Sequence, residues 1–293
     1  MMRGHDWVDR DLYPFESKYL DVGPGRVHYV DEGSGPIVLM VHGTPVWSFV
    51  YRALIRDLSR DHRVIAPDHL GFGLSDRPDD FGYRPADHAR VLEELIGQLG
   101  LRDITLVVHD FGGPIGLSYA ARHPDNVRAL VLFNTWLWSL TGSKSERIAR
   151  VMGGGFGRFL YTRLNISPRT IVPASFGDRS RLSKAAHRHY IEALDTPRAR
   201  YPSWVLAREL LGSSQWYDQL WKDRAVLARH PTLFVWGRKD PAFGDALPRW
   251  REAFPDARVL ELVDVGHFVQ EEAPQEATSA IRTFLAEAAV PET

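Results

Sequence analysis

The sequence predicts an α/β protein with a mostly parallel sheet that is covered by helices on both faces. Three observations favour this class. The run at 37–41 is continuously apolar and those at 104–108 and 127–133 are largely apolar, which is typical of strands buried on both faces. Helix-like stretches alternate with these strands. The alternation stops between about 136 and 227 and resumes at 231, which predicts a helical insertion between two parts of one core.

The composition excludes several classes of function. Lys plus Arg (36) and Asp plus Glu (37) nearly cancel, so neither a nucleic-acid partner nor a membrane partner is expected. The chain contains no cysteine, which excludes a disulfide framework, a thiolate nucleophile and a Cys-based metal site. No apolar run is long enough to span a bilayer, and the first residues lack the apolar core of a signal peptide. We therefore expect a cytoplasmic location, whereas the oligomeric state stays open.

The first half of the chain divides as follows. Residues 1–15 carry many charges and no periodicity, so we expect a surface arm. Two short strands around the turn 23–25, a buried strand at 37–41, a helix over 47–58 and a strand at 63–67 follow. The loop 68–78 is rich in glycine, but it lacks the spacing of a phosphate-binding or dinucleotide-binding loop. A helix that Gly100 ends comes next, since Val91, Leu92, Leu95 and Ile96 recur at helical spacing.

The second half begins with a strand at 104–109 and a helix that His123-Pro124-Asp125 ends. A buried strand follows over 127–134. Residues 136–228 contain helix-like stretches and many arginines, which we interpret as a cap whose charges form a solvated face. Strands at 232–236 and 258–262 and a final amphipathic helix around Ile281 complete the core.

Asp110 lies at the sharpest bend that the sequence predicts. A buried strand ends there, and Gly112 and Gly113 open a helix. This strand–turn–helix has the form of a nucleophile elbow, with Asp in the place that Ser usually holds. A carboxylate at that place displaces a leaving group from carbon and becomes an ester, whereas a serine attacks a carbonyl group. The alternative is an ordinary capping aspartate at a helix start.

Asp240 and His267 also follow predicted parallel strands, and loops at that edge of a sheet converge. The chain order of nucleophile, acid and histidine is the hydrolase order. We therefore assign Asp110 as nucleophile, His267 as the base that activates water, and Asp240 as the acid that orients His267. Each residue alone could be structural, because Asp240-Pro241 resembles a turn and the chain has twelve histidines.

The segment His42-Gly43-Thr44-Pro45 follows the strand 37–41. A loop at this place can aim backbone N–H groups at a developing oxyanion. We expect the N–H groups near Thr44 and Phe111 to serve this purpose. On its own, the segment could equally be a plain strand-to-helix turn.

Three segments, 42–52, 64–78 and 107–116, together resemble the haloalkane dehalogenases. The resemblance covers the core and is weak in the cap. It implies an α/β-hydrolase fold with an eight-stranded sheet, a helical cap inserted after the sixth strand, a small apolar substrate, and neither cofactor nor metal. It divides the chain into a core (1–135), a cap (136–228) and the rest of the core (229–293). Asp110 matches the family nucleophile and His267 its base. One branch of the family carries the acid at the position of Asn134, so Asp240 fits the other branches.

Two positions depart from the family pattern. Many members hold the halide with a Trp after the nucleophile, where this chain has Phe111, and with an Asn where it has Thr44. A phenyl ring cannot donate a hydrogen bond, so leaving-group stabilisation would fall to the Thr44 hydroxyl or to a cap indole such as Trp136 or Trp138.

Four other functions are alternatives, of which the residues disfavour the last two. An epoxide hydrolase would use cap tyrosines, for which Tyr161, Tyr190, Tyr201 and Tyr217 are candidates. A β-lactone decarboxylase would share the core and the Asp elbow. A non-catalytic receptor on the same fold would not need the base, and a Ser-type esterase would not carry Asp at the elbow.

Overall fold

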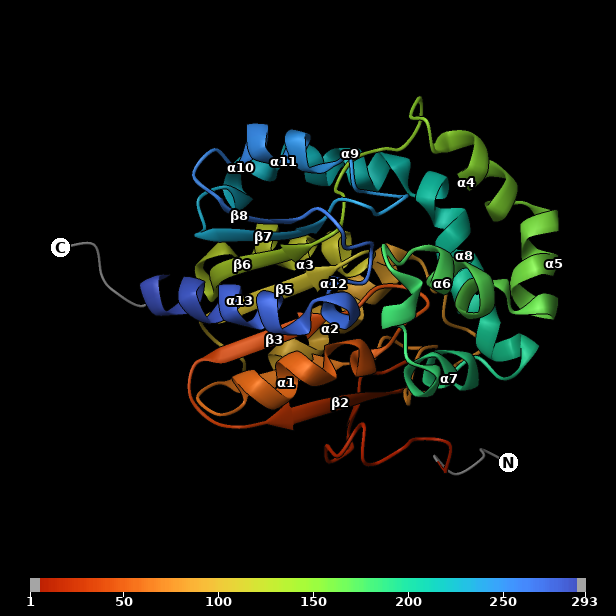
Figure 1. Cartoon of the computed structure of the whole chain (residues 1–293), viewed down its shortest axis with the longest axis horizontal. Helices are drawn as coiled ribbons and strands as arrows, with labels where there is room; N and C mark the ends of the chain where they lie inside the picture. Colours follow the sequence, from red (N-terminus) through yellow and green to blue (C-terminus); the bar gives the residue numbers. More distant parts are fainter. Residues whose placement is uncertain (1–5, 289–293) are drawn as a thin grey trace.

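The computed structural model describes residues 6–288 and contains one eight-stranded sheet (Figure 1). The strands follow one another in the order β1-β2-β4-β3-β5-β6-β7-β8. Neighbours from β4 to β8 are parallel, whereas β2 is antiparallel to β1 and to β4. The predicted α/β-hydrolase fold is confirmed. The strands are β1 (Lys18–Asp21), β2 (Arg26–Glu32), β3 (Ile37–Val41), β4 (Arg63–Pro67), β5 (Ile104–His109), β6 (Val127–Phe133), β7 (Thr232–Gly237) and β8 (Arg258–Leu262).

Helices cover both faces of this sheet because successive strand residues point to opposite sides. On β3, Val38 and Met40 belong to one apolar cluster and Leu39 and Val41 to another. The first cluster includes residues of α1 (Arg52–Leu58), α12 (Val269–Glu272) and α13 (Pro274–Ala288). The second includes residues of α2 (Pro85–Gln98), α3 (Gly112–Arg122) and α11 (Leu247–Ala253). The continuous apolar character of the central strands therefore reflects burial on two faces.

A helical segment connects β6 to β7, and the described residues 136–228 contain no strand. Its longer helices are α4 (Glu146–Gly153), α5 (Gly155–Leu164), α7 (Lys184–Glu192), α8 (Pro197–Gly212) and α9 (Ser214–Lys222), and α6 (Val172–Ala174) and α10 (Arg224–Leu227) are short. Figure 1 shows α4 to α8 beyond one end of the strands. Helices α9 and α10 instead contact α3. The boundary of the cap at residue 228 therefore stays a prediction. The helices that lie beyond the end of the sheet are α4 to α8.

The N-terminal segment is not the surface arm that its charges suggested. Val8, Tyr13 and Phe15 are buried in the same cluster as α1, and the Tyr13 hydroxyl lies 2.6 Å from the Ser48 hydroxyl. Widely spaced aromatic residues provide this burial without a period, which is why the sequence pattern did not reveal it. Residues 1–5 lie outside the described part. Among the described helices, none is both long enough and apolar enough to cross a membrane.

Candidate active site

Asp110 occupies a strained turn directly after β5. Its φ of +52° lies in the left-handed region, where a residue other than glycine costs about 1–2 kcal/mol. The turn is held by its own backbone, since Asp110 N donates to Asn134 O at 3.1 Å and the Thr135 hydroxyl donates to Asp110 O at 2.7 Å. A Cβ on Gly112 would lie 2.0 Å from Val41 O, so only glycine lets α3 start this close to β3. The turn holds the Asp110 carboxylate beside the loop that follows β3.

The two predicted backbone donors lie at this carboxylate. Thr44 N donates to Asp110 Oδ1 at 2.9 Å, and the N–H of Phe111 also hydrogen-bonds to the carboxylate. Gly43 allows the close approach, because a Cβ there would lie 2.2 Å from Asp110 Oδ1. Two N–H groups that converge on this carboxylate can stabilise negative charge there, and such a donor is typically worth about 3–4 kcal/mol in a transition state.

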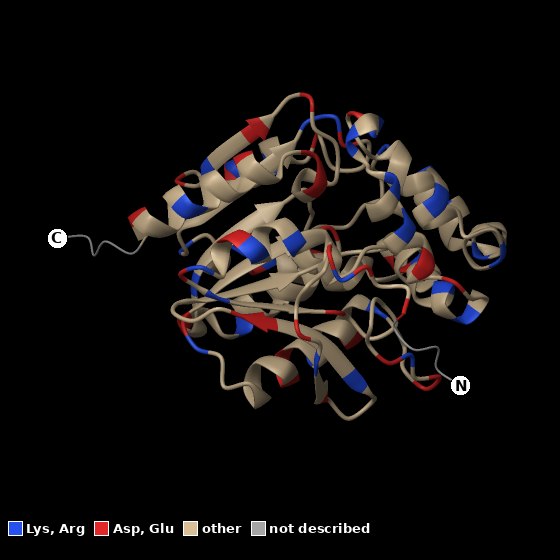
Figure 2. Ribbon diagram, turned by 60° about the horizontal axis from the view of Figure 1, so that its bottom comes forward, with Lys and Arg blue, Asp and Glu red and all other residues tan. Residues whose placement is uncertain are grey.

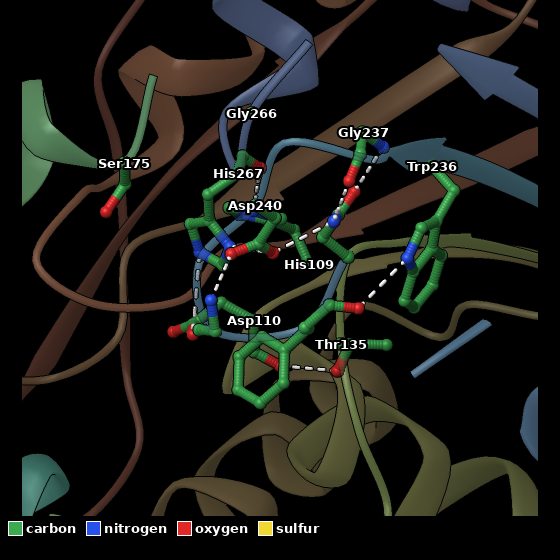
Figure 3. Close-up of polar contacts among 12 residues, drawn as sticks. His109, Asp110, Thr135, Ser175, Trp236, Gly237, Asp240, Gly266 and His267 are labelled. Carbon is green, nitrogen blue, oxygen red and sulfur yellow. Dashed lines mark hydrogen bonds and ion pairs between the residues drawn. The ribbon is translucent and has the colours of Figure 1, made fainter. Parts of the chain in front are cut away.

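His267 lies between two carboxylates (Figure 3). Its Nδ1 is 2.8 Å from Asp240 Oδ2, which is a short hydrogen bond, and its Nε2 is 3.6 Å from Asp110 Oδ2. All three side chains are buried. Because Asp240 accepts from Nδ1, Nε2 is left free to accept a proton near Asp110. The structure thus brings the three residues that the sequence singled out into one contact network.

Asn134 completes the network from the end of β6. Its amide nitrogen donates to Asp240 Oδ2 and to Gly237 O, both at 2.9 Å, and its oxygen accepts from Gly237 N at 2.8 Å. The sequence marked Asn134 only as a position where some relatives carry the acid. The structure shows that this position orients Asp240, which also accepts from Ala242 N.

The cap and the core meet at the backbone of His267, a contact that no sequence pattern indicates. His267 N donates to Ser175 O at 2.8 Å, and His267 O lies 2.9 Å from His109 Nε2. The buried carboxylate of Glu272 accepts from Gly266 N in the core and from Gly177 N and Asp178 N in the cap. A glutamate in a helix is usually exposed to solvent, so the sequence does not mark Glu272 as a buried residue that holds a loop.

Glu272 therefore positions the loop that carries His267, and its removal has a predictable effect. In Glu272→Gln, one oxygen becomes an NH₂ group, which cannot accept from a backbone N–H. We expect a loss of about 1–3 kcal/mol in the free energy of unfolding, because a backbone donor is left without its partner. We also expect a lower kcat with little change in KM. Urea denaturation and steady-state kinetics measure both, and an unchanged kcat in a destabilised variant would limit Glu272 to stability.

Electrostatics separate the pKa values of the three groups. Burial raises the pKa of Asp110 above its ordinary value of 3.8, against the charge of His267 and the two backbone donors. Burial would also raise the pKa of Asp240, but the charge and hydrogen bond of His267, with help from Ala242 and Asn134, lower it. Burial would lower the pKa of His267, yet Asp240 and then Asp110 raise it above 6.5.

These directions predict the pH dependence of turnover. His267 accepts a proton only when it is neutral, so turnover is expected to fall as the pH drops through a His267 pKa above 6.5. The linked stability has the opposite sign: the contribution of charged His267 is present below about 6.5 and is lost as the pH rises through the raised pKa. The contribution of Asp240 is present above its ordinary 3.8 and is lost as the pH falls through its lowered pKa. A kcat profile between pH 5 and 9 tests the first statement, and an acid-limb midpoint below 6.5 would contradict it.

The three residues predicted to bind the oxyanion or the halide, Thr44, Phe111 and Trp136, are all near the elbow, and their side chains differ in hydrogen bonding. The Thr44 hydroxyl donates to the Ser203 hydroxyl at 3.2 Å. The Phe111 ring packs edge-on against the Trp136 ring, with centroids 4.8 Å apart. The Trp136 side chain is fully buried, and its Nε1 has no hydrogen-bond partner among the described residues. Trp136 therefore brings an unused donor to the neighbourhood of Asp110. Trp138, the other cap indole considered, packs on Trp221 and Trp250 instead.

The four cap tyrosines do not form an obvious acid pair. The Tyr190 hydroxyl donates to Glu271, and the Tyr217 hydroxyl donates to Glu209 O at 3.1 Å. The Tyr161 hydroxyl hydrogen-bonds with Ser167, and the ring of Tyr201 packs on Trp204. No hydrogen bond joins a tyrosine hydroxyl to Asp110 in the described part of the chain. Tyr161 and Tyr217 nevertheless interact electrostatically with Asp110, so the hydrogen bonds do not exclude the epoxide-opening alternative.

Comparisons with known proteins agree with this geometry. A model of the α/β-hydrolase fold family matches residues 36–274. Haloalkane dehalogenase 2 of Mycobacterium tuberculosis is 40% identical over 276 residues, which are 93% of this chain and 96% of the relative. A cis-3-alkyl-4-alkyloxetan-2-one decarboxylase of Shewanella oneidensis is 35% identical, over 94% of this chain and 90% of the relative. Among solved structures, haloalkane dehalogenase DbeA from Bradyrhizobium elkani superimposes with a TM-score of 0.84 at 26% identity, over 94% and 98% of the two chains.

Proposed function

This chain belongs to the haloalkane dehalogenase family of α/β-hydrolase fold proteins, and from that premise we propose that it hydrolyses carbon–halogen bonds with Asp110 as the nucleophile. The observation that supports the proposal most strongly is the arrangement of the two Asp110 oxygens. Oδ1 accepts from the Thr44 N–H, whereas Oδ2 lies 3.6 Å from His267 Nε2. One oxygen is thus held for charge stabilisation, and the other is free to attack.

The first step forms a covalent ester. Asp110 Oδ2 attacks the carbon that bears the halogen, the new C–O bond forms, and the halide leaves with the bonding electron pair. In the second step, His267 Nε2 takes a proton from water, and the resulting hydroxide attacks the carbonyl carbon of the ester. The N–H groups of Thr44 and Phe111 stabilise the oxyanion, which collapses to release the alcohol and the Asp110 carboxylate. Asp240 stabilises the imidazolium until it releases its proton to solvent. The net products are an alcohol, a halide ion and a proton.

A second function is favoured by one observation. The side chain of Phe111 has no N–H to offer a halide, unlike the Trp of many dehalogenases, and a decarboxylase of alkyl-substituted β-lactones is 35% identical to this chain. A β-lactone decarboxylase on the same Asp elbow is therefore the alternative substrate class. A cytoplasmic location and the lack of a cofactor stay predictions of the sequence.

Removal of the Trp136 indole distinguishes dehalogenation from β-lactone decarboxylation. If the chain is a dehalogenase, Trp136→Phe is expected to lower kcat/KM for primary bromoalkanes by about tenfold or more, because a hydrogen bond to a charged group is typically worth about 1.5–3 kcal/mol. Halide release measures this. Trp138→Phe is the matched control, since that indole packs away from Phe111, and it is expected to keep full activity. A panel of bromoalkanes, epoxides and β-lactones run beside it decides the class: turnover of β-lactones alone would replace dehalogenation by decarboxylation.

A further inference from the structure

Five large apolar side chains are exposed on two consecutive cap helices. Ile148 and Val151 on α4 and Phe156, Phe159 and Leu164 on α5 are each 50–70% exposed. Elsewhere in the described part of the chain, the exposed large apolar side chains are Val263, at 69%, and Tyr19, at 37%. We call the outer surface of α4 and α5, residues 144–164, the α4–α5 face. A concentration of exposed apolar side chains on one surface is typical of an interaction site.

The same face is strongly basic. Residues 144–164 include one carboxylate and five cations, although the whole chain has a net charge of −1. All five cations are exposed, namely Lys144, Arg147, Arg150, Arg158 and Arg163. Figure 2 shows Lys and Arg spaced along the outer helices of the cap. The net charge of the whole chain, from which no membrane partner was expected, does not reveal this local cluster of cations.

The α4–α5 face is the outermost surface of the cap. Figure 1 shows α4 and α5 at the edge of the molecule, and both helices pack on α8. Helix α8 in turn carries Ser203, whose hydroxyl accepts from Thr44 beside the elbow. One helix therefore separates the face from the active site, and no described segment covers its apolar side chains.

We propose that the α4–α5 face docks on an anionic lipid surface. Helices that combine Phe, Leu and Ile on one side with arginines around them lie in the membrane interface, where the apolar groups enter the headgroup boundary and the cations attract anionic lipids. A second copy of the chain fits this face less well. A twofold dimer places the same patch on both sides of the interface, so the five cations of each copy would oppose each other. The proposed docking would attach the protein to a lipid surface, and it does not depend on the proposed reaction.

Vesicle sedimentation tests the proposal with the full chain. We expect the protein to sediment with vesicles of phosphatidylcholine and phosphatidylglycerol in equal parts, and at least about tenfold less with pure phosphatidylcholine. Binding is expected to weaken steeply between 50 and 500 mM salt, because ions screen the attraction of exposed charges.

Variants locate the contact. Phe156→Ser with Phe159→Ser is expected to lower vesicle affinity by about tenfold or more, since the exposed rings would no longer bury their apolar area in the membrane. Arg147→Gln and Arg163→Gln are each expected to lower it about fivefold. Arg158 is left intact, because it lies 5.3 Å from the centroid of the Trp204 ring and contributes to packing. Val263→Ser and Arg56→Gln are matched controls on exposed residues outside the face and are expected to bind like the wild type.

Two results would overturn the proposal. One is the absence of sedimentation with the anionic vesicles at low salt. The other is a dimer that is detected by analytical ultracentrifugation in the absence of vesicle binding. If Phe156→Ser with Phe159→Ser dissociates that dimer, the face is a subunit contact. Circular dichroism and activity on soluble substrate verify that each variant is folded, and neither readout decides the outcome.

Discussion

Replacing Asp110 by Asn is expected to abolish turnover with every accepted substrate, by at least about 10⁴-fold in kcat. The amide occupies the same volume and can keep the hydrogen bond from Thr44 N, but it is not a nucleophile, so no ester forms. The stability is expected to rise. Burial raises the pKa of Asp110, which means that its charged form is disfavoured in the folded state at neutral pH, and Asn removes that cost. A higher Tm with no activity would show that the loss is chemical and not structural.

Asp103→Asn is the matched control for this experiment. Asp103 also has a positive φ, +53°, but it lies at the start of β5, at the opposite edge of the sheet. The variant is expected to retain full turnover. Retained activity in Asp110→Asn, with the amide verified by intact mass, would remove Asp110 from the mechanism.

Replacing His267 by Phe is expected to stop the reaction after the first step. The Asp110 carboxylate can still displace the leaving group, but no base is left to activate water, so the alkyl ester accumulates. Mass spectrometry is expected to show the alkyl group on the peptide that contains Asp110, with one leaving group released per chain. His267→Gln serves as the second variant, because it can keep a hydrogen bond to Asp240 and so disturbs the buried carboxylate less.

The control and the isotope test complete this prediction. His62→Phe changes a histidine next to β4 at the opposite edge of the sheet and is expected to turn over normally. In the wild type, a single turnover in ¹⁸O-labelled water is expected to place the label on Asp110, because hydroxide attacks the carbonyl carbon of the ester. Label in the alcohol alone, or no adduct in His267→Phe with an accepted substrate, would contradict a covalent ester.

The fold was predictable because its signals are local. The strands β3, β4 and β8 have the predicted bounds, since each is a five-residue stretch with apolar residues at its centre and turns on both sides. Parallel strands present their carboxyl ends at one edge, so the positions of Asp110, Asp240 and His267 directly after such strands predict that the three side chains converge. For residues 6–15, the part of the predicted surface arm that the structure describes, the prediction is wrong, because Tyr13 and Phe15 pack at long range without a period that marks the burial.

The sequence by itself determined the sheet, the elbow, the three converging side chains and the backbone donors at Thr44 and Phe111. These features depend on apolar runs and turn residues that are close together in the sequence. Only the tertiary structure decided that Asn134 orients Asp240, that Glu272 ties the cap to the loop of His267, and that the apolar side chains of α4 and α5 are left exposed. Those features depend on which loops and helices meet after folding. A hydrogen bond between residues a hundred positions apart, or the lack of a covering helix, has no local pattern in the sequence.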